Sequence, residues 1–231
     1  MKIEIWSDIA CPFCYIGKRR FESALSKFEH RNQVEIKWKS FELNADIPRR
    51  TTTTVLEFLT AHKGISSDQA KGLFKHVTQT AAKDGLKFNF DIGLHGNTFD
   101  GHRLVHYATE NGCGDAMKER LFSGYFVRGE SVADIDTLVS MATDVGLDAE
   151  KTREMLQSDK FSDEVRMDEA QARKLGIHGV PFFRIDEKHE MSGIQAPEGF
   201  LQVLNKAWNS TEGAKSSTAG VACNEDGCVR R

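Results

Sequence analysis

The first forty residues show a clear pattern of apolar and polar positions. Residues 2–7 contain a short apolar run, Ile3, Ile5 and Trp6 with Glu4 between them, as expected for a buried strand. Apolar residues then recur at helical spacing over 11–30, and residues 33–41 approximately alternate between apolar and polar side chains. This part of the chain therefore predicts a strand, a helix and a second, half-buried strand.

The C-terminal part of the sequence predicts two strands followed by a helix, whereas the N-terminal part predicts a helix between two strands. Two short strands are expected over 182–186 and 188–192, joined by a charged turn and followed by a helix from 197 to 208. Pro197 suits the first turn of that helix, because the N–H that proline lacks would have no partner there. Residues 211–231 are rich in Ser, Thr, Gly and Ala and have little periodicity, so they predict a flexible tail.

The long middle of the chain predicts helices almost throughout. Several of its segments begin with Ser or Asp, which are typical N-caps, and end in glycine, a typical C-cap. Only residues 86–93 read as a short extended piece. The order of elements predicts an α/β fold in which residues 1–45 and 177–210 form one discontinuous domain. Residues 46–176 form a helical domain inserted into it.

The composition and net charge limit the kinds of molecule that the protein is expected to bind. The chain has 231 residues, of which 39% are hydrophobic and 28% charged, with a net charge of -3. This balance gives no reason to expect nucleic-acid binding or a polybasic membrane anchor. No apolar run approaches the length of a membrane span, and the first residues lack the apolar segment and cleavage site of a signal peptide. We therefore expect a cytoplasmic protein.

The cysteines are the strongest chemical signal. Four of the five form two close pairs, Cys11/Cys14 and Cys223/Cys228, and Cys113 stands alone. Stable disulfides are rare in the cytoplasm, where close pairs are typically catalytic, redox-sensing or metal-binding.

The first pair opens the first predicted helix, which is the thioredoxin arrangement when β-α-β and β-β-α units flank it. The N–H groups and dipole of a helix N-terminus stabilise a thiolate, so we expect Cys11 to be the exposed attacking group. The two-residue gap brings Cys14 within disulfide reach, where it can resolve a mixed disulfide.

Pro181 gives a second, independent indication. It stands at the start of the third strand of the scaffold, where a thioredoxin-type fold carries a cis proline beside the active site. Proline is tolerated there because it cannot donate to the sheet ladder. The backbone of Val180 would then be free to pair with an extended substrate and align its disulfide on Cys11.

Three stretches closely resemble the FrnE-like branch of the DsbA family: WSDIACPFCYIGKRRFESAL, HGNTFDGHRLVHYA and LGIHGVPFF. The resemblance implies a thioredoxin fold with a large inserted α-helical domain. It implies thiol–disulfide oxidoreductase or disulfide-isomerase activity, with Cys11 as nucleophile, Cys14 as resolving residue and a cis Pro181. Expected partners are proteins with thiols or disulfides, and glutathione or a thioredoxin-type reductant. Nothing in the sequence requires a cofactor.

The resemblance also gives roles to other residues. Some FrnE-like proteins carry a C-terminal cysteine pair with the spacing of Cys223/Cys228, which would act as an auxiliary redox relay. A flexible linker from Ser210 would give that pair a reach of about 20 Å. His102 belongs to a family motif near the groove between the domains, where it would form a substrate wall. Apart from the resemblance, the aromatic side chains of Trp6, Phe13 and Tyr15 are expected to offer apolar contact to unfolded polypeptide.

Phe13 also bears on the direction of the chemistry. In the best-known periplasmic members a histidine at this place stabilises the first thiolate, so Phe13 implies a less oxidising disulfide. Such a potential suits isomerase or reductase work. Related glutathione-dependent isomerases of chromene carboxylates commonly carry a serine instead of a redox dithiol at the active helix, and the dithiol at 11 and 14 argues against that activity.

Two other classes of function remain open. The two cysteine pairs together could form one zinc site, because both spacings occur in such sites. The protein could instead be a holdase that grips unfolded chains without redox turnover. A metal site at His95, His102 and His106 is a weaker alternative, since histidines at helical spacing are more often packing or capping residues.

Overall fold

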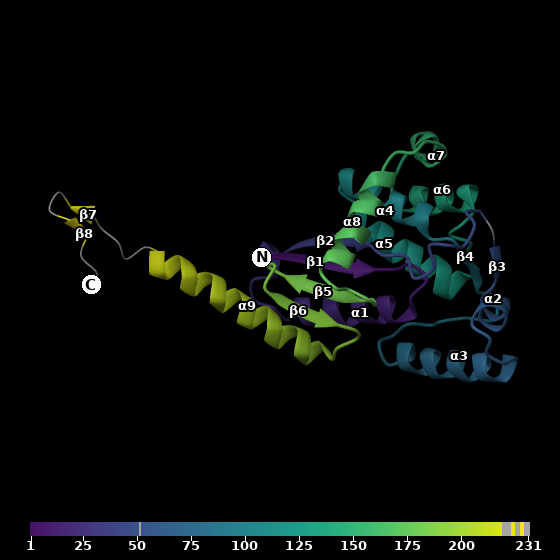
Figure 1. Ribbon diagram of the computed structural model, residues 1–231, viewed down its shortest axis with the longest axis horizontal. Helices are drawn as coiled ribbons and strands as arrows, with labels where there is room; N and C mark the ends of the chain where they lie inside the picture. The colour runs from purple at the N-terminus through teal and green to yellow at the C-terminus, as the bar shows by residue number, and fades with distance from the viewer. Residues whose placement is uncertain (51, 219–222, 225–226, 229–231) are drawn as a thin grey trace.

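The computed structural model describes the backbone of residues 1–50, 52–218, 223–224 and 227–228, and the side chains of residues 1–210 except those at positions 51 and 62. A four-stranded sheet with the order β2-β1-β5-β6 forms the scaffold (Figure 1). Its strands are β1 (Lys2–Ser7), β2 (Glu35–Ser40), β5 (Phe182–Ile185) and β6 (His189–Ser192). β1 is parallel to β2 and antiparallel to β5, and β5 is antiparallel to β6. This is the predicted thioredoxin topology.

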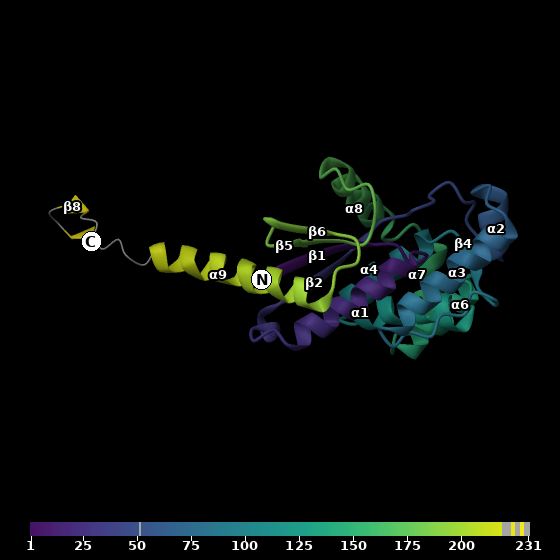
Figure 2. The same cartoon turned by 90° about the horizontal axis from the view of Figure 1, so that it is seen from below.

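Helices cover both faces of the sheet because β1 alternates its side chains between two apolar layers. Ile3 and Ile5 pack with α1 (Pro12–Ser26) and α9 (Pro197–Thr218) on one face. Trp6 points to the other face, where it contacts Ala172 of α8 (Ser162–Lys174). Figure 2 shows the sheet between α8 on one side and α1 with α9 on the other.

The helical region lies between β2 and β5 in the chain and beside one end of the sheet in Figure 1. Its other helices begin at capping or small residues, as the sequence predicts: Thr54 and Ser66 make capping boxes, and Asp134 and Asp148 accept a backbone N–H of the first turn. They are α2 (Val55–His62), α3 (Ser67–Ala82), α4 (Phe99–Glu110), α5 (Gly114–Ser123), the π-helical turn η2 (Gly124–Arg128), α6 (Ile135–Asp144) and α7 (Ala149–Gln157). None of the described helices is both long and apolar enough to cross a membrane.

The main hydrophobic core runs across the boundary between the scaffold and the helical region. Tyr15 of α1 stacks on Phe122 of α5, with ring centroids 4.9 Å apart, and on Phe88, at 5.8 Å. Cys11 and Cys14 belong to the same cluster of buried side chains. One face of the helix that carries the first cysteine pair is therefore buried against the insertion.

The C-terminal ends of two helices, α1 and α9, differ from their predicted positions. α1 ends at Ser26 instead of residue 30 and is followed by the short 3₁₀ helix η1 (Arg31–Gln33). α9 continues to Thr218, ten residues past its predicted end at 208, so the first part of the predicted tail is helical. Extending an existing helix adds one hydrogen bond per residue without a new nucleation cost, which favours this extension over the weak helix propensity of Ser, Thr and Gly.

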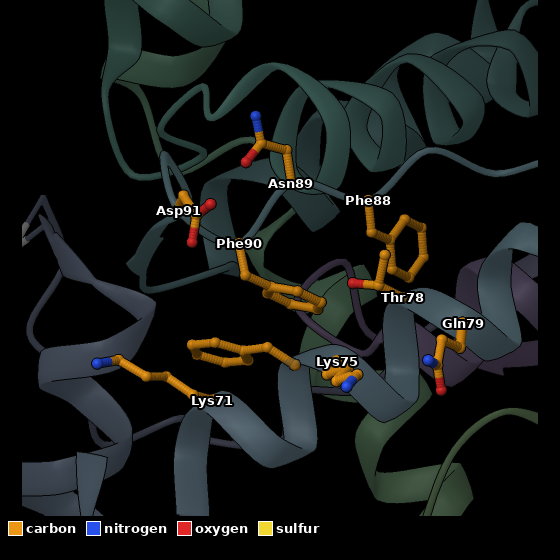
Figure 3. Close-up of a pocket in the computed structure, with 9 residues that line it drawn as sticks. Lys71, Lys75, Thr78, Gln79, Phe88, Asn89, Phe90 and Asp91 are labelled. Atoms are coloured by element: carbon orange, nitrogen blue, oxygen red, sulfur yellow. The ribbon is translucent and has the colours of Figure 1, made fainter. Parts of the chain in front are cut away.

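The extended piece predicted over 86–93 is not a strand. A two-stranded sheet forms just after it, between β3 (Thr52–Thr54) and β4 (Leu94–Gly96). The aromatic rings of 86–93 instead pack onto α3, where Phe74 stacks on Phe90 with centroids 4.6 Å apart. Figure 3 shows Phe88 and Phe90 lining a pocket of about 340 Å³ with polar side chains of α3. The alternation of apolar residues there reflects aromatic packing.

Candidate active site

Cys11 occupies the N-cap position of α1, with Pro12 in the first helical position. Its backbone is extended, with φ −91° and ψ 112°, and its N–H donates to the carbonyl of Asp8 at 3.2 Å. Cys14 lies one turn into the helix, and its N–H donates to the Cys11 carbonyl at 3.0 Å. The turn is fixed locally because proline has its φ preset for the helix start and needs no N–H partner there.

The Cys11 thiol is covered, contrary to the sequence prediction of an exposed group. Only 4% of the residue is accessible, and its Sγ donates to the carbonyl of Val180 at 3.5 Å. Cys14 is also buried. The cover comes from the segment that precedes β5 and from the helical region, neither of which is adjacent to Cys11 in the sequence.

The Val180–Pro181 peptide bond is cis, as the resemblance implied. Pro181 packs onto α1 at Gly17, where a Cβ atom would lie 3.0 Å from Pro181 Cγ. The missing side chain of Gly17 therefore lets the helix and the proline segment approach each other. This contact places Val180 over the start of α1.

Asp8 connects the first cysteine's loop to two other segments. Its buried carboxylate accepts the N–H of Leu43 at 2.7 Å and that of Ala10 at 3.3 Å, and it lies 3.4 Å from His102 Nε2. Burial opposes ionisation of this carboxyl group, but the hydrogen bonds, led by that of His102, hold its pKa below the ordinary value. Asp8 therefore stays ionised and keeps the loop in shape.

His102 is buried beside Asp8 and does not form a substrate wall, so that expectation is wrong. Burial lowers the pKa of His102, and the bond to Asp8 only partly offsets it, so the ring is neutral at pH 7. The other two histidines have different partners. His95 bonds to the Tyr125 hydroxyl, and His106 lies 3.1 Å from a carboxylate oxygen of Asp168.

The aromatic residues expected to contact polypeptide divide into two groups. Trp6 is buried, with its indole N–H donated to the Asp168 carbonyl at 3.1 Å. Tyr15 is also buried and bonds to Glu119 at 2.7 Å. The expectation of a contact surface is wrong for both, because helices distant in sequence cover them. Phe13, in contrast, is 38% accessible.

The two thiols have different environments. Burial, and then the hydrogen bond with Cys11, raise the pKa of Cys14 well above its ordinary value, so Cys14 stays protonated. A lysine that the sequence analysis missed, Lys118 of α5, is buried with its Nζ 5.1 Å from the ring centroid of Phe122, which belongs to the same apolar cluster as Cys11 and Cys14. Its only sequence signal is a lysine beside the apolar positions Leu121 and Phe122 of an amphipathic helix.

The second cysteine pair lies outside the part of the chain whose side chains are described. The backbone forms two short antiparallel strands, β7 (Cys223–Asn224) and β8 (Gly227–Cys228), with Cys223 opposite Cys228. Directly opposite residues in such a pair have Cα atoms about 4.5–5.5 Å apart, within the range of a disulfide.

The loop after β2 contains a buried carboxylate, that of Glu42, close to a second acidic group. The Glu42 side chain is 1% accessible, and it shares the guanidinium of Arg166 with Glu169, at 2.6 and 2.7 Å. Burial is the main cause that raises the pKa of Glu42 to about 7, and the charge of Glu169 adds to it.

We expect Glu42→Gln to stabilise the protein above pH 7. In the unfolded chain Glu42 ionises near 4.5, so the folded state binds more protons between about 4.5 and 7. The stability of the wild type therefore falls as the pH rises through this window, and glutamine removes that loss. The gain at pH 8 should be about 1–2 kcal/mol, and close to zero at pH 4.5.

Urea unfolding of both proteins at the two pH values measures this gain. Glu29→Gln, at an exposed position, is the matched control and should change neither value. An equal effect of Glu42→Gln at both pH values would contradict the explanation.

The fold and the site together define a class of protein. A cysteine pair with a two-residue gap at the start of the helix after β1, facing a cis proline before a β-hairpin, is typical of thioredoxin-fold thiol–disulfide oxidoreductases. The family model of the DSBA-like thioredoxin domain matches residues 2–205. The chain belongs to this family.

Three known proteins are similar to the chain. The probable DsbA oxidoreductase SCO1869 from Streptomyces coelicolor is 41% identical, with a TM-score of 0.86 over 100% of this chain and 99% of that one. The cytosolic disulfide reductase DsbM from Pseudomonas aeruginosa is 14% identical, with a TM-score of 0.64 over 90% and 99%, and shows the fold alone. The uncharacterized protein YwbO from Bacillus subtilis is 29% identical over 192 residues, 80% of this chain and 86% of its own. The FrnE-like branch stays a prediction.

Proposed function

We propose that the protein is a disulfide isomerase that acts on protein disulfides through Cys11 and Cys14. The observation that carries this proposal is the geometry of the pair: Cys11 at the helix N-cap, against the carbonyl of Val180, with a protonated Cys14 one turn behind it. A nucleophile is thereby held beside backbone that can align an extended chain, and a second thiol is held in reserve.

The chemistry proceeds by thiolate exchange. The Cys11 thiolate attacks a substrate disulfide, one substrate sulfur leaves as thiolate, and a Cys11–substrate disulfide forms. When another substrate thiolate attacks this mixed disulfide, the substrate's bonds are rearranged with no net transfer of electrons. When Cys14 loses its proton and attacks, the Cys11–Cys14 disulfide forms and the substrate is reduced by two electrons.

The surroundings of Cys11 support a polypeptide as substrate. Within the described residues the N–H of Val180 has no hydrogen-bond partner, so it can pair with an extended chain. Phe13 is 38% accessible and Leu43, which the sequence analysis missed, is 44% accessible. We assign apolar contact with the substrate to these two side chains, in place of Trp6 and Tyr15.

An isomerase needs its dithiol reduced, so a reductant must reset it. We propose glutathione or a thioredoxin-type protein, in the cytoplasm. The structural neighbour DsbM is described as a cytosolic disulfide reductase and has a structure with glutathione.

The second pair is proposed as an auxiliary redox relay, supported by the opposed placement of Cys223 and Cys228 in β7 and β8. The helix up to Thr218 changes the expected path. α9 extends beyond the sheet on the side opposite the helical region (Figure 1). Residues 211–218 are thus helical where a flexible linker from Ser210 was expected.

The deciding experiment is a titration of every cysteine against graded glutathione potentials, followed by alkylation and peptide mass spectrometry. We expect Cys11 and Cys14 to titrate together as a two-electron couple between roughly -120 and -270 mV. The reduced protein should also reactivate scrambled ribonuclease. Cysteines that react only after a chelator is added would replace this proposal with the zinc site. Binding of unfolded chains that persists in Cys11→Ser, without exchange, would indicate a holdase.

A further inference from the structure

Lys118 is an ammonium group in the interior of the protein, with 1% of the residue accessible. It lies on α5, in the helical region, and points toward the end of β1. Its Nζ donates to the carbonyl of Ser7 at 3.3 Å and lies 5.5 and 5.1 Å from the ring centroids of Trp38 and Phe122. A charged group in such an apolar setting costs free energy unless another charge compensates it.

No carboxylate of the described residues lies within salt-bridge distance of Lys118, which distinguishes it from the other buried lysine nearby. Lys18 of α1 is 2% accessible and contacts Glu22, Asp115 and Glu119, the last at 3.0 Å. The charge of Lys18 is thus neutralised by three acids. Lys118 has the ionised Asp8 among its neighbours, beyond salt-bridge distance, and otherwise only dipoles and rings while the dithiol is uncharged.

The ionisable groups that face Lys118 come from three elements. Burial is the largest effect and lowers the pKa of Lys118 to about 8, so it is mostly charged at pH 7. In return, its charge lowers the pKa values of Cys14 and His102. The facing groups are Asp8 in the loop after β1, Cys11, Cys14 and Lys18 on α1, and His102 on α4.

We propose that Lys118 is a positioning residue for the redox reaction: its buried ammonium stabilises the thiolate of the reduced dithiol and thereby sets the reduction potential. The inference rests on the proposed Cys11–Cys14 couple. Reduction of that disulfide takes up two electrons and two protons, and the form active in exchange arises when Cys11 releases one of these protons and becomes a thiolate. The oxidised site lacks this thiolate, so the charge of Lys118 favours the reduced site.

Two matched substitutions test the role of the charge. Lys118→Met removes the uncompensated ammonium and keeps the length of the side chain. Lys18→Met removes a buried ammonium from the same region, but one that carboxylates already neutralise. The readouts are the rate at which iodoacetamide alkylates Cys11 at pH 7 and the reduction potential in dithiothreitol or glutathione buffers.

We expect Lys118→Met to slow alkylation 3- to 10-fold and to shift the equilibrium toward the disulfide by a similar factor. A tenfold shift makes the potential about 30 mV more negative. Lys18→Met should leave both values within twofold of the wild type. A folded Lys118→Met protein, judged by its melting curve, with unchanged rate and potential would overturn the inference.

A second measurement does not depend on the variant's folding. The titration of Lys118 in the wild type can be followed by NMR of its side chain in oxidised and reduced protein. Because coupling between two sites is reciprocal, the thiolate must raise the pKa of Lys118 in the reduced state. Equal pKa values in both states would overturn the inference. Absence of any reversible Cys11–Cys14 couple in the wild type would instead overturn the proposed function, and this inference with it.

Discussion

Replacing Cys11 by serine is expected to lower the rate of disulfide exchange at least ~10³-fold, because the thiolate that attacks the substrate is lost. Replacing Cys14 by serine should have a different result. The first step still occurs, but the mixed disulfide persists because the resolving thiol is gone. Reactivation of scrambled ribonuclease measures the first effect, and non-reducing electrophoresis of cell extract with Cys14→Ser measures the second.

Cys113→Ser is the matched control for both substitutions. Cys113 is partly buried at the N-cap of α5, and we assign it no part in the exchange, so its loss should leave the rate unchanged. A Cys11→Ser protein that retains the wild-type rate would move the reaction away from α1. If adding Cys223→Ser to that variant then abolished the remaining rate, the reaction would be assigned to the C-terminal pair.

Replacing Arg103 by methionine is expected to lower the free energy of unfolding by about 3–5 kcal/mol. Arg103 is fully buried on α4, and its guanidinium binds the carboxylate of Asp100 at 2.7 Å. It also donates to the carbonyls that end α7 and lead into α8, those of Met155, Leu156, Ser158 and Lys160. Methionine would remove the Arg103 donor from all of these acceptors, of which Asp100 keeps Arg49 and the Met155 carbonyl keeps Ser158. Urea unfolding measures the loss.

Arg49→Met provides the comparison for Arg103, because Arg49 binds the same carboxylate of Asp100 from a largely exposed position. Exposed ion pairs contribute about 0–1 kcal/mol, so this substitution should cost less than 1 kcal/mol. A similarly small cost for Arg103→Met would show that water replaces the lost donors.

The scaffold could be predicted because its signals are local. Each strand shows its buried face within a few residues, and Cys11 and Cys14 lie within one turn of the same helix. Pro181 could be placed because a proline at a strand start is a local feature as well. The site's electrostatics could not be predicted this way, since Lys118 and His102 reach it from helices that are distant in sequence.

The same distance explains which expectations were wrong. Trp6 and Tyr15 are aromatic residues of the type that forms contact surfaces, but α8 and α5 cover them in the folded chain. Nothing within ten residues of either side chain reveals that cover. The burial of Cys11 has the same origin, because its neighbour Val180 lies 169 positions away.

That separation has a consequence during synthesis. The chain is made at about 5–20 residues per second, so Cys11 emerges from the ribosome roughly 10 to 30 s before Val180. β1 can pair with β2 in this interval, but β5 does not yet exist and the dithiol has no cover. The cysteines of a nascent chain are therefore more open to oxidants than those of the finished fold. Oxidative stress should accordingly modify Cys11 more in newly made protein than in protein that folded before the stress began.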